Sequence, residues 1–375
     1  MKILQLGKFY PIRGGVEKVM YDLMEGLSSR GIDCDMMCAA CEGHRGEVRV
    51  NEHGRVLTYH SWKKIAGTTI APSMLWSLRK LCKQYDLIHV HHPDPMVALA
   101  LWLSGYKGKV VLHWHSDIVD QKMALKLYMP LQNWLIRRAD KIIGTTPVYL
   151  KESPHLQQAQ DKTVCVPIGI ERVQEVGAES IARLKARYPS KKLVFSLGRL
   201  VPYKGYDYLI EAGQYIDDDC MILIGGTGPL REKLEKKITD LGLEDKVRLL
   251  GRISDEELPV YYHACDIYCM SSVKKTEAFG IVQIEAMSCG KPLIATNIPE
   301  SGVSWVNKHG VSGLNVAPMN AKELATAIKN ILVDQTAYNN FVEGSRKRFD
   351  EVFHIDKMVD GCLDVYKDIL SRKRI

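Results

Sequence analysis

The sequence predicts an α/β protein made of two doubly wound, Rossmann-like domains, each with a mainly parallel sheet. The chain has 375 residues, more than one hydrophobic core usually organises. Strand-like and helix-like segments alternate along nearly its whole length, which is the pattern of parallel sheets covered by helices. The alternation starts again after a polar stretch at residues 171–192, which we interpret as a linker between two domains.

The first half alternates short apolar runs with segments of helical spacing. The runs that we expect to form strands are residues 2–6, 33–38, 56–59, 87–90, 109–113, 141–144 and 163–166. Apolar residues spaced three and four apart predict helices between these runs. The expected helices are residues 16–29, 72–84, 96–104, 123–138 and 147–151.

The second half repeats this pattern. Its expected strands are residues 193–197, 220–224, 247–250, 267–270, 293–295 and 314–316. Its expected helices are residues 206–215, 229–241, 255–263, 281–289 and 321–332, and the last helices, from about 335 to 371, have no strand after them. Doubly wound sheets bind ligands beyond the carboxyl ends of their strands, so two such edges facing each other would make a cleft.

The composition is that of a soluble globular protein, with 46% hydrophobic and 25% charged residues. No apolar run is long enough to cross a bilayer, and Lys8 breaks the first apolar run, which we interpret as a buried strand and not as a signal peptide. We therefore expect a cytoplasmic protein whose ten cysteines are reduced thiols. The net charge of +7 fits an anionic substrate or membrane surface. No basic stripe interleaved with aromatic residues predicts a nucleic-acid partner.

The stretch at residues 274–292 organises the candidate site. It places Glu277 and Glu285 eight residues apart, with a helix expected from about Gly280 to Cys289. Eight residues at a helical rise cover roughly 12 Å. The free amides and dipole of a helix N-terminus favour phosphate. The spacing therefore predicts a sugar hydroxyl near Glu277, a phosphate over Gly280 and Ile281, and a ribose near Glu285; an amphipathic surface helix with two solvated acids is the alternative.

Three glycine-rich loops follow predicted strands, one in the first domain and two at the same edge of the sheet in the second domain. Gly14 and Gly15 precede a helix and would allow an anion to approach its N-terminus, although a plain turn explains them equally well. Arg199 and Lys204 lie five apart in a loop, and two fixed cations there would fit a diphosphate; two solvated loop charges are the alternative. Gly226 lies in a tight turn that could contact a base or phosphate through its backbone.

A histidine-rich pair of strands supplies a further candidate. Strand alternation puts His113 and His115 on one face, with His115 at the ligand edge and Asp117 close by. A satisfied structural histidine is the alternative. A metal site with the neighbouring motif at residues 89–94 is a weaker interpretation, because that motif lacks the spacing of a zinc hydrolase. We expect no metal and no other cofactor.

Three other patterns have simpler explanations. Cysteines at positions 34, 38 and 41 have the spacing of radical iron–sulfur enzymes, but they overlap a predicted buried strand. The acidic run at residues 217–219 precedes its strand, so it lies at the edge away from the ligand. Cys265 and Cys269, with His263, fall on a helix end and a buried strand, where packing in the core is expected.

Together these motifs resemble those of the retaining nucleotide-sugar glycosyltransferases of family four, whose GT-B fold consists of two Rossmann-like domains. The similarity covers nearly the whole chain. Its motifs are GGVE (14–17), HSD (115–117), VPIGI (166–170), GRLVPYKG (198–205), GGTGP (225–229) and EAFGIVQIE (277–285), the last being the family's E-x7-E signature. Ile168 stands where the family often has Asn, so any contact made by that side chain is missing here.

The resemblance implies roles for the candidate residues. Arg199 and Lys204 would neutralise the diphosphate leaving group in place of a metal, Glu277 would hold sugar hydroxyls and Glu285 the ribose. His115 would contact the sugar, and no enzymic base is assigned. The catalytic set is therefore His115, Arg199, Lys204 and Glu277. The donor-binding set is Gly14, Gly15, Arg199, Lys204, Gly226, Glu277, Ala278, Phe279, Gly280, Ile281 and Glu285.

The resemblance also implies a domain organisation. Residues 1–172 would form an acceptor-binding domain and residues 173–349 a nucleotide-sugar-binding domain. The helix at 350–375 would cross back and pack on the first domain, so that the cleft can open and close.

A narrower similarity concerns the substrates. Residues 115–122 and 126–132 are similar to those of bacterial mannosyltransferases that build O-antigen and other surface polysaccharides. This implies GDP-mannose as the donor and a lipid-diphosphate-linked oligosaccharide as the acceptor. A transferase that uses a UDP-sugar, a sugar-nucleotide epimerase and a non-catalytic binding module are the alternatives.

The helix expected at residues 72–84 predicts a membrane contact. Trp76, Arg79, Lys80 and Lys83 share the face opposite its apolar side. A basic face with an aromatic side chain suits peripheral binding to an anionic membrane. An ordinary solvated face is the alternative.

Overall fold

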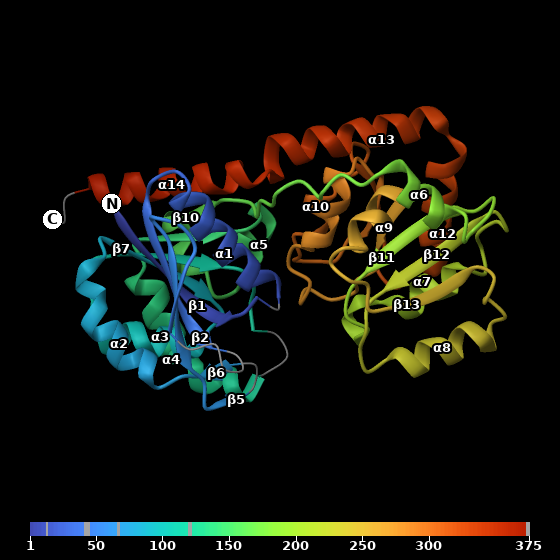
Figure 1. Cartoon of the computed structure of the whole chain (residues 1–375). Coiled ribbons are helices and arrows are strands. Elements are labelled where there is room, and N and C mark those ends of the chain that lie inside the picture. Colours follow the sequence, from blue (N-terminus) through green and yellow to red (C-terminus); the bar gives the residue numbers. More distant parts are fainter. Residues whose placement is uncertain (13, 41–45, 66–67, 119–121, 373–375) are drawn as a thin grey trace. The chain divides into compact units, whose positions relative to one another are not determined.

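The computed structural model describes residues 1–12, 14–40, 46–65, 68–118 and 122–372 (Figure 1). The chain divides into two compact units: unit 1 comprises Met1–Ile170 and Ile355–Ile375, and unit 2 comprises Glu171–His354. The amide of Ile355 donates to the carbonyl of Ile170 at 2.9 Å. The chain therefore leaves unit 1 and returns to it at adjacent points.

Unit 1 is built on an eight-stranded sheet with the order β10-β9-β8-β7-β1-β2-β4-β3. The pairs are parallel except that β3 runs antiparallel to β4. The strands are β1 (Lys2–Tyr10), β2 (Asp33–Ala40), β3 (Gly46–Arg49), β4 (Arg55–His60), β7 (Leu87–His92), β8 (Lys109–Trp114), β9 (Lys141–Gly144) and β10 (Thr163–Cys165). A separate antiparallel hairpin is formed by β5 (Lys63–Ile65) and β6 (Thr68–Ile70).

Different helices cover the two faces of this sheet. The helices of unit 1 are α1 (Gly15–Ser28), α2 (Ser73–Leu81), α3 (Pro95–Ser104), α4 (Lys122–Arg138), α5 (Pro147–Glu152) and α14 (Ile355–Ser371), with 3-10 turns η1 (Cys82–Gln84) and η2 (Gln157–Lys162). Side chains of β7 alternate between the faces: His89 contacts Tyr366 of α14, whereas His92 contacts Tyr128 of α4. Because α14 also packs on α1, the carboxy-terminal helix is part of unit 1.

Unit 2 is built on a six-stranded parallel sheet with the order β13-β12-β11-β14-β15-β16. Its strands are β11 (Lys192–Leu197), β12 (Cys220–Gly225), β13 (Val247–Gly251), β14 (Ile267–Met270), β15 (Leu293–Thr296) and β16 (Gly313–Val316). Its helices are α6 (Ala178–Lys185), α7 (Tyr206–Ala212), α8 (Arg231–Asp240), α9 (Leu258–Ala264), α10 (Ile281–Ser288), α11 (Val303–Val306), α12 (Ala321–Val333) and α13 (Gln335–Arg348), with η3 (Pro202–Lys204) and the π-helical η4 (Phe349–Phe353).

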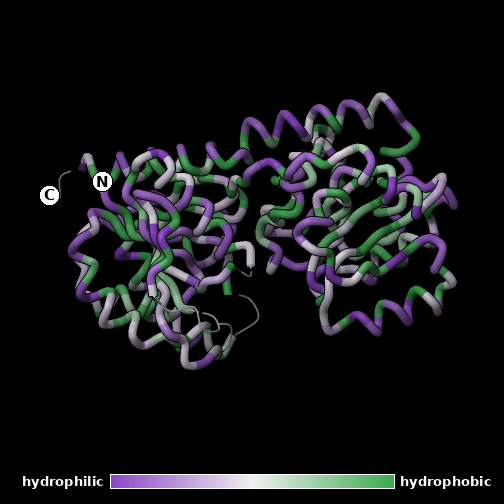
Figure 2. The backbone as a smooth tube through the Cα atoms, in the orientation of Figure 1, coloured by the Kyte–Doolittle hydropathy of each residue, from purple (hydrophilic) through white to green (hydrophobic). Residues whose placement is uncertain are grey.

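Hydropathy follows this layering (Figure 2). All residues of β7, β12, β14 and β15 are buried, as expected of strands covered on both faces. The helix α8 is mostly hydrophilic in Figure 2, and its buried residues are Leu234 and Ile238. No helix within the described ranges is long and apolar enough to span a membrane.

The predicted α/β class with two Rossmann-like sheets is confirmed, and the elements differ mainly at their ends. The helix expected at 255–263 begins only at Leu258, because residues 254–257 form a turn in which Glu257 bonds back to Ser254. The sequence did not predict β3, the β5–β6 hairpin or α11. Each is four residues or fewer, and all of β3 is exposed, so no apolar periodicity marks them.

Candidate active site

Three adjacent strands of unit 2 bring the predicted loops to one edge. The strand β11 pairs with β12 on one side and with β14 on the other. The loop with Arg199 and Lys204 follows β11, Gly226 follows β12, and Glu277 follows β14. Since the strands are parallel, all three loops leave from the carboxyl edge of the sheet.

An ion pair joins two of these loops. Lys204 Nζ lies 2.5 Å from Glu277 Oε2, and the two side chains are only 12% and 13% exposed. The Ser272 hydroxyl donates to the same carboxylate oxygen at 3.0 Å. The Ser301 hydroxyl donates to the backbone carbonyl of Glu277 at 2.5 Å. Glu277 is therefore held through both its side chain and its backbone.

Two glycines let the loops approach this closely. Gly205 has φ +67°, and a Cβ there would lie 2.1 Å from the carbonyl oxygen of Ser271. Gly226 has φ +126°, and a Cβ there would lie 2.0 Å from the carbonyl oxygen of Gly198. Any side chain at either position would push the neighbouring backbone away, so the loops after β11, β12 and β14 depend on glycine for their contact.

Arg199 differs from Lys204. Its side chain is exposed, and within the described part of the chain no ion pair or hydrogen bond holds its guanidinium. The sequence led us to expect two fixed cations in this loop. The structure holds Lys204 in place and leaves Arg199 in solvent.

The N-terminus of α10 offers free backbone donors. Gly280 caps the helix in the left-handed conformation, with φ +80°. Among the described residues, the amides of Phe279, Gly280 and Ile281 have no hydrogen-bond acceptor. Buried Gln283 fixes the turn, because its Nε2 donates to the Phe279 carbonyl at 2.9 Å. Ala278 is also buried, and its carbonyl accepts from Gly302 at 3.0 Å. A turn with this rigidity and open amides can bind an anion.

Glu285 lies further along α10 and is held by an aromatic hydroxyl. The hydroxyl of Tyr262 donates to Glu285 Oε2 at 2.5 Å. Burial, together with the neighbouring Glu285 carboxylate, raises the pKa of Tyr262 well above its usual value. The tyrosine therefore keeps its proton and continues to donate to Glu285.

His115 of unit 1 follows directly after β8 and is part of a buried cluster. His113 and His115 share one face, as predicted, and their rings stack with centroids 4.1 Å apart. His91 Nδ1 lies 2.9 Å from His115 Nε2. Burial lowers the pKa of His115 well below its usual value, which makes it a neutral imidazole at pH 7.

Asp117 is held by hydrogen bonds with Trp114, Tyr149 and Ser153. Its Oδ1 accepts from Trp114 Nε1 at 3.0 Å and from the Ser153 hydroxyl at 2.7 Å. Its amide donates to the Tyr149 hydroxyl at 2.8 Å. The aspartate of the HSD motif therefore fixes the loop after β8.

Gly14 and Gly15 lie at the start of α1. Gly14 is the cap residue in an extended conformation, with φ −147°, and Gly15 is the first helical residue. A Cβ at Gly14 would lie 2.5 Å from Glu17 Oε2. The structure thus places a carboxylate beside the proposed anion site, and residue 13 lies outside the described ranges.

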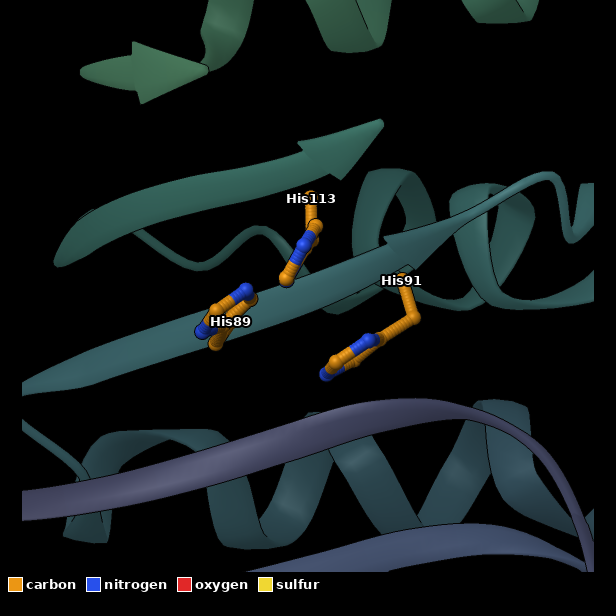
Figure 3. Close-up of side chains that lie close together, drawn as sticks. All are labelled: His89, His91 and His113. Atoms are coloured by element: carbon orange, nitrogen blue, oxygen red, sulfur yellow. The ribbon is translucent and has the colours of Figure 1, made fainter. Parts of the chain in front are cut away.

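A second grouping, of His89, His91 and His113, has nitrogen atoms within 4.8 Å of one another (Figure 3). The ring planes of these histidines are inclined to one another by only 8° to 27°. Imidazole lone pairs lie in the ring plane, so those of nearly parallel, stacked rings do not converge on one point. Three ligands of a tetrahedral zinc must converge at about 2.0–2.1 Å from the ion. As arranged, this cluster is a stack and not a metal cage.

The remaining sequence patterns are structural. Cys34 and Cys38 are buried in β2, and burial raises the pKa of the Cys34 thiol; Cys41 lies outside the described residues. Asp217 and Asp218 precede β12 at the edge away from the site, where they pair with Lys329 and Lys246.

Three residues that hold the glutamates of unit 2 were not predicted from the sequence: Tyr262, Ser272 and Ser301. Ser272 is the second residue after β14, so its place at the ligand edge could have been predicted from the strand pattern. The other side chains meet their partners across separate strands and loops, and no local pattern marks them.

Solved structures similar to this fold include glycosyltransferases of the GT-B class. The Anabaena protein Alr3699/HepE in complex with UDP has a TM-score of 0.79 at 22% identity, covering 98% of this chain and 100% of that one. Sucrose-phosphate synthase from Thermosynechococcus elongatus also has a TM-score of 0.79 at 22% identity, covering 99% and 100%. The fold is therefore the GT-B glycosyltransferase fold.

Sequence relatives identify the family. Residues 13–173 match the family described as Glycosyltransferase Family 4, and residues 179–348 match Glycosyl transferases group 1. The chain is 30% identical over 377 residues to O-antigen chain mannosyltransferase C of Escherichia coli, covering 100% of both. It is also 30% identical to D-rhamnosyltransferase WbpZ of Pseudomonas aeruginosa, covering 85% of this chain and 83% of that one. The chain belongs to the family-four glycosyltransferases and is an enzyme of the hexosyltransferase class.

Proposed function

We propose that this enzyme is a retaining mannosyltransferase that moves mannose from GDP-mannose to a lipid-diphosphate-linked oligosaccharide in O-antigen or surface-polysaccharide synthesis. The observation that carries the proposal is the Lys204–Glu277 pair beside the open amides at the N-terminus of α10. A cation and an array of N–H donors suit a diphosphate, and a carboxylate beside them suits sugar hydroxyls. The full-length similarity to an O-antigen chain mannosyltransferase supports mannose as the sugar.

In this proposal the leaving diphosphate is stabilised by the protein alone. Lys204 and Arg199 supply positive charge, and the amides of Phe279, Gly280 and Ile281 supply hydrogen bonds. Removing one preorganised donor of this kind typically costs about 3–4 kcal/mol of barrier. No metal is then required, because these groups neutralise the negative charge that develops on the leaving group.

The two glutamates hold the ends of the donor. Lys204 and Ser272 both bond to Oε2 of Glu277, which fixes the carboxylate for contact with sugar hydroxyls. Tyr262 fixes Glu285 in the same way for the ribose. His115 contacts the transferred sugar, and no residue is assigned as an enzymic base.

The proposed acceptor places the enzyme at a membrane surface. Met74 and Leu78 of α2 are buried, whereas Trp76 is 69% exposed, and Arg79, Lys80 and Lys83 are exposed on the same helix region. Amphipathic basic surfaces with exposed tryptophan bind anionic lipid headgroups. We propose peripheral contact with the inner face of the cytoplasmic membrane through α2.

The donor is tested by thermal shift and calorimetry with GDP, GDP-mannose, UDP and UDP-glucose, in the presence of chelator. A ligand that binds the folded state raises its unfolding midpoint. Selective stabilisation by GDP and GDP-mannose is expected. Stabilisation by the UDP ligands alone would replace mannose with the second candidate, a UDP-sugar donor, which the UDP complex of the similar Anabaena fold favours. Conversion of free nucleotide sugar without acceptor would indicate an epimerase.

A further inference from the structure

Three buried side chains from adjacent strands form a hydrogen-bonded chain that ends at His115. Gln5 on β1 and His91 on β7 are fully buried, and His115 is 5% exposed. Gln5 Oε1 lies 2.7 Å from His91 Nε2, and His91 Nδ1 lies 2.9 Å from His115 Nε2. β1 pairs with β7, and β7 pairs with β8, so the chain crosses the sheet from strand to strand.

The chemistry of these groups fixes where the protons lie. A carboxamide oxygen only accepts hydrogen bonds, so His91 Nε2 carries a proton and donates it to Gln5. A neutral imidazole has one protonated nitrogen, so His91 Nδ1 is an acceptor. The partner of that acceptor, His115 Nε2, must then carry a proton. His115 Nδ1 is left unprotonated; it is buried in this structure and has no hydrogen-bond partner among the described residues.

The opposite end of the Gln5 side chain agrees with this orientation. Gln5 Nε2 lies 3.3 Å from the hydroxyl of Tyr366 and 3.8 Å from Cys34 Sγ, and both atoms accept hydrogen bonds. The amide group therefore has acceptors at its nitrogen and a donor at its oxygen. Burial keeps the pKa of His91 and His115 well below the usual value, so both rings are neutral at pH 7, as the chain requires.

We infer that Gln5 and His91 are positioning residues that hold His115 as its Nε2–H tautomer and so reserve Nδ1 as a hydrogen-bond acceptor for a sugar hydroxyl. The inference rests on the proposed function for the identity of the ligand. A bare imidazole nitrogen accepts from a hydroxyl and repels a phosphate oxygen, which has no proton to donate. His115 is therefore assigned to the sugar end of the donor and not to its diphosphate.

The tautomer is measured directly by nitrogen NMR on the full chain labelled with ¹⁵N-histidine, without any substrate. The chain has twelve histidines, so the two ring-nitrogen signals of His115 are assigned as those missing from the spectrum of His115→Gln. A protonated and an unprotonated ring nitrogen have well-separated shifts. We expect His115 to show a protonated Nε2 and an unprotonated Nδ1. The reverse pattern would mean that the Gln5 amide is turned round, and would overturn the inference whatever the enzyme's activity.

Gln5→Met tests whether the chain controls the tautomer. Methionine keeps the length of the side chain and removes the acceptor for His91. We expect His115 to show a mixture of tautomers in this variant. The matched control is His113→Leu, because His113 lies in the same stack, 5.3 Å from His91 between ring centroids, but neither of its ring nitrogens has a hydrogen-bond partner among the described residues. The control should keep the wild-type His115 signals. If both variants altered the tautomer ratio of His115 equally, or if neither variant altered it, Gln5 would have only a packing role.

Turnover gives the second readout. A small misplacement of a group that positions the substrate can cost about 100-fold in rate, so we expect Gln5→Met to lower kcat at least about tenfold with a smaller change in the donor KM. His113→Leu should retain turnover within about twofold. If GDP-mannose proves not to be the donor, the NMR result still stands, so failure of the proposed function and failure of this inference are distinguishable. If Gln5→Met changed the tautomer of His115 but left turnover unchanged, the positioning role would be overturned.

Discussion

Lys204 and Glu277 form an ion pair in unit 2, with Nζ 2.5 Å from Oε2, although both side chains have proposed roles toward the donor. Each side chain is largely buried, so salt screens this pair less than an exposed one. The pair holds both groups beside the N-terminus of α10 before a donor arrives. Binding of the diphosphate would add a third partner to an arrangement that is already in place.

Lys204→Met should lower kcat by about 100- to 1,000-fold, because it removes a preorganised charge at the leaving group. Glu277 would also lose its partner, so the variant should be less stable than the wild type. The measurement is steady-state kinetics beside a thermal unfolding curve. The matched control is Lys275→Met, which breaks the neighbouring, more exposed Lys275–Glu300 pair. If the control loses as much activity, the effect is not specific to Lys204.

Arg199→Met should behave differently from Lys204→Met. The guanidinium makes no ion pair within the described residues, so its loss should leave the unfolding midpoint unchanged. The donor kcat/KM should still fall by about 100-fold if Arg199 meets the diphosphate. Arg183→Met, at an exposed position on α6, serves as the control. Unchanged kinetics in Arg199→Met would mean that this arginine is only a solvated charge.

Tyr262→Phe should weaken nucleotide binding without moving the backbone. It removes the hydroxyl that donates to Glu285 at 2.5 Å. A hydrogen bond to a charged group contributes about 1.5–3 kcal/mol, so the Kd for GDP measured by calorimetry should rise by roughly tenfold or more. The control is Tyr261→Phe, because that ring contacts the same Phe195 but is only partly buried. Equal affinity in Tyr262→Phe and the wild type would remove Glu285 from the nucleotide site.

Acidification should destabilise the protein through its buried histidines. Burial lowers the pKa of His113 to about 3, and lowers the pKa values of His89, His91, His92 and His115 well below 6.5. Below pH 6.5 the unfolded chain binds protons at these positions and the folded chain does not. The free energy of unfolding should therefore fall as pH falls, by up to about 1.4 kcal/mol per pH unit for each histidine.

Urea unfolding between pH 7.5 and 5.5, followed by tryptophan fluorescence, measures this slope. His113→Leu removes one buried histidine and should reduce the total fall in the free energy of unfolding over this pH range by about 1.4 kcal/mol. A slope that is the same in the variant and the wild type would show that His113 is not a neutral buried group in the folded protein.

Charge reversal on α2 should weaken membrane binding. In the variant Arg79, Lys80 and Lys83 are changed to Glu, and sedimentation with anionic vesicles should fall, because each basic side chain near such a surface contributes about 1 kcal/mol. The control reverses three charges on α8, at Arg231, Lys233 and Lys236, so that the net charge changes equally. Unchanged sedimentation of the α2 variant, or equal loss in both, would exclude α2 as the binding surface.

Much of the fold was predictable because its signals are local. Short apolar runs mark the buried strands, as in β12, where every residue is buried. Gly280 and Gly290 bracket α10, and Asp94, Thr146 and Asn320 cap other helices with their side chains. The β5–β6 hairpin and β3 gave no such signal, because each depends on a partner strand and not on its own periodicity.

The sequence by itself determined the α/β class, the two mainly parallel sheets and the loops that carry the candidate donor residues, because the alternation of strands and helices and the turn residues depend on only a few neighbouring positions. The roles of those residues stay predictions. Only the tertiary structure decided which side chains pair. It joined Lys204 to Glu277 across 73 positions, Tyr262 to Glu285 across 23, and Gln5 to His91 across 86. The physical reason is that strand order and register set these distances, and neither is contained in any local stretch of sequence.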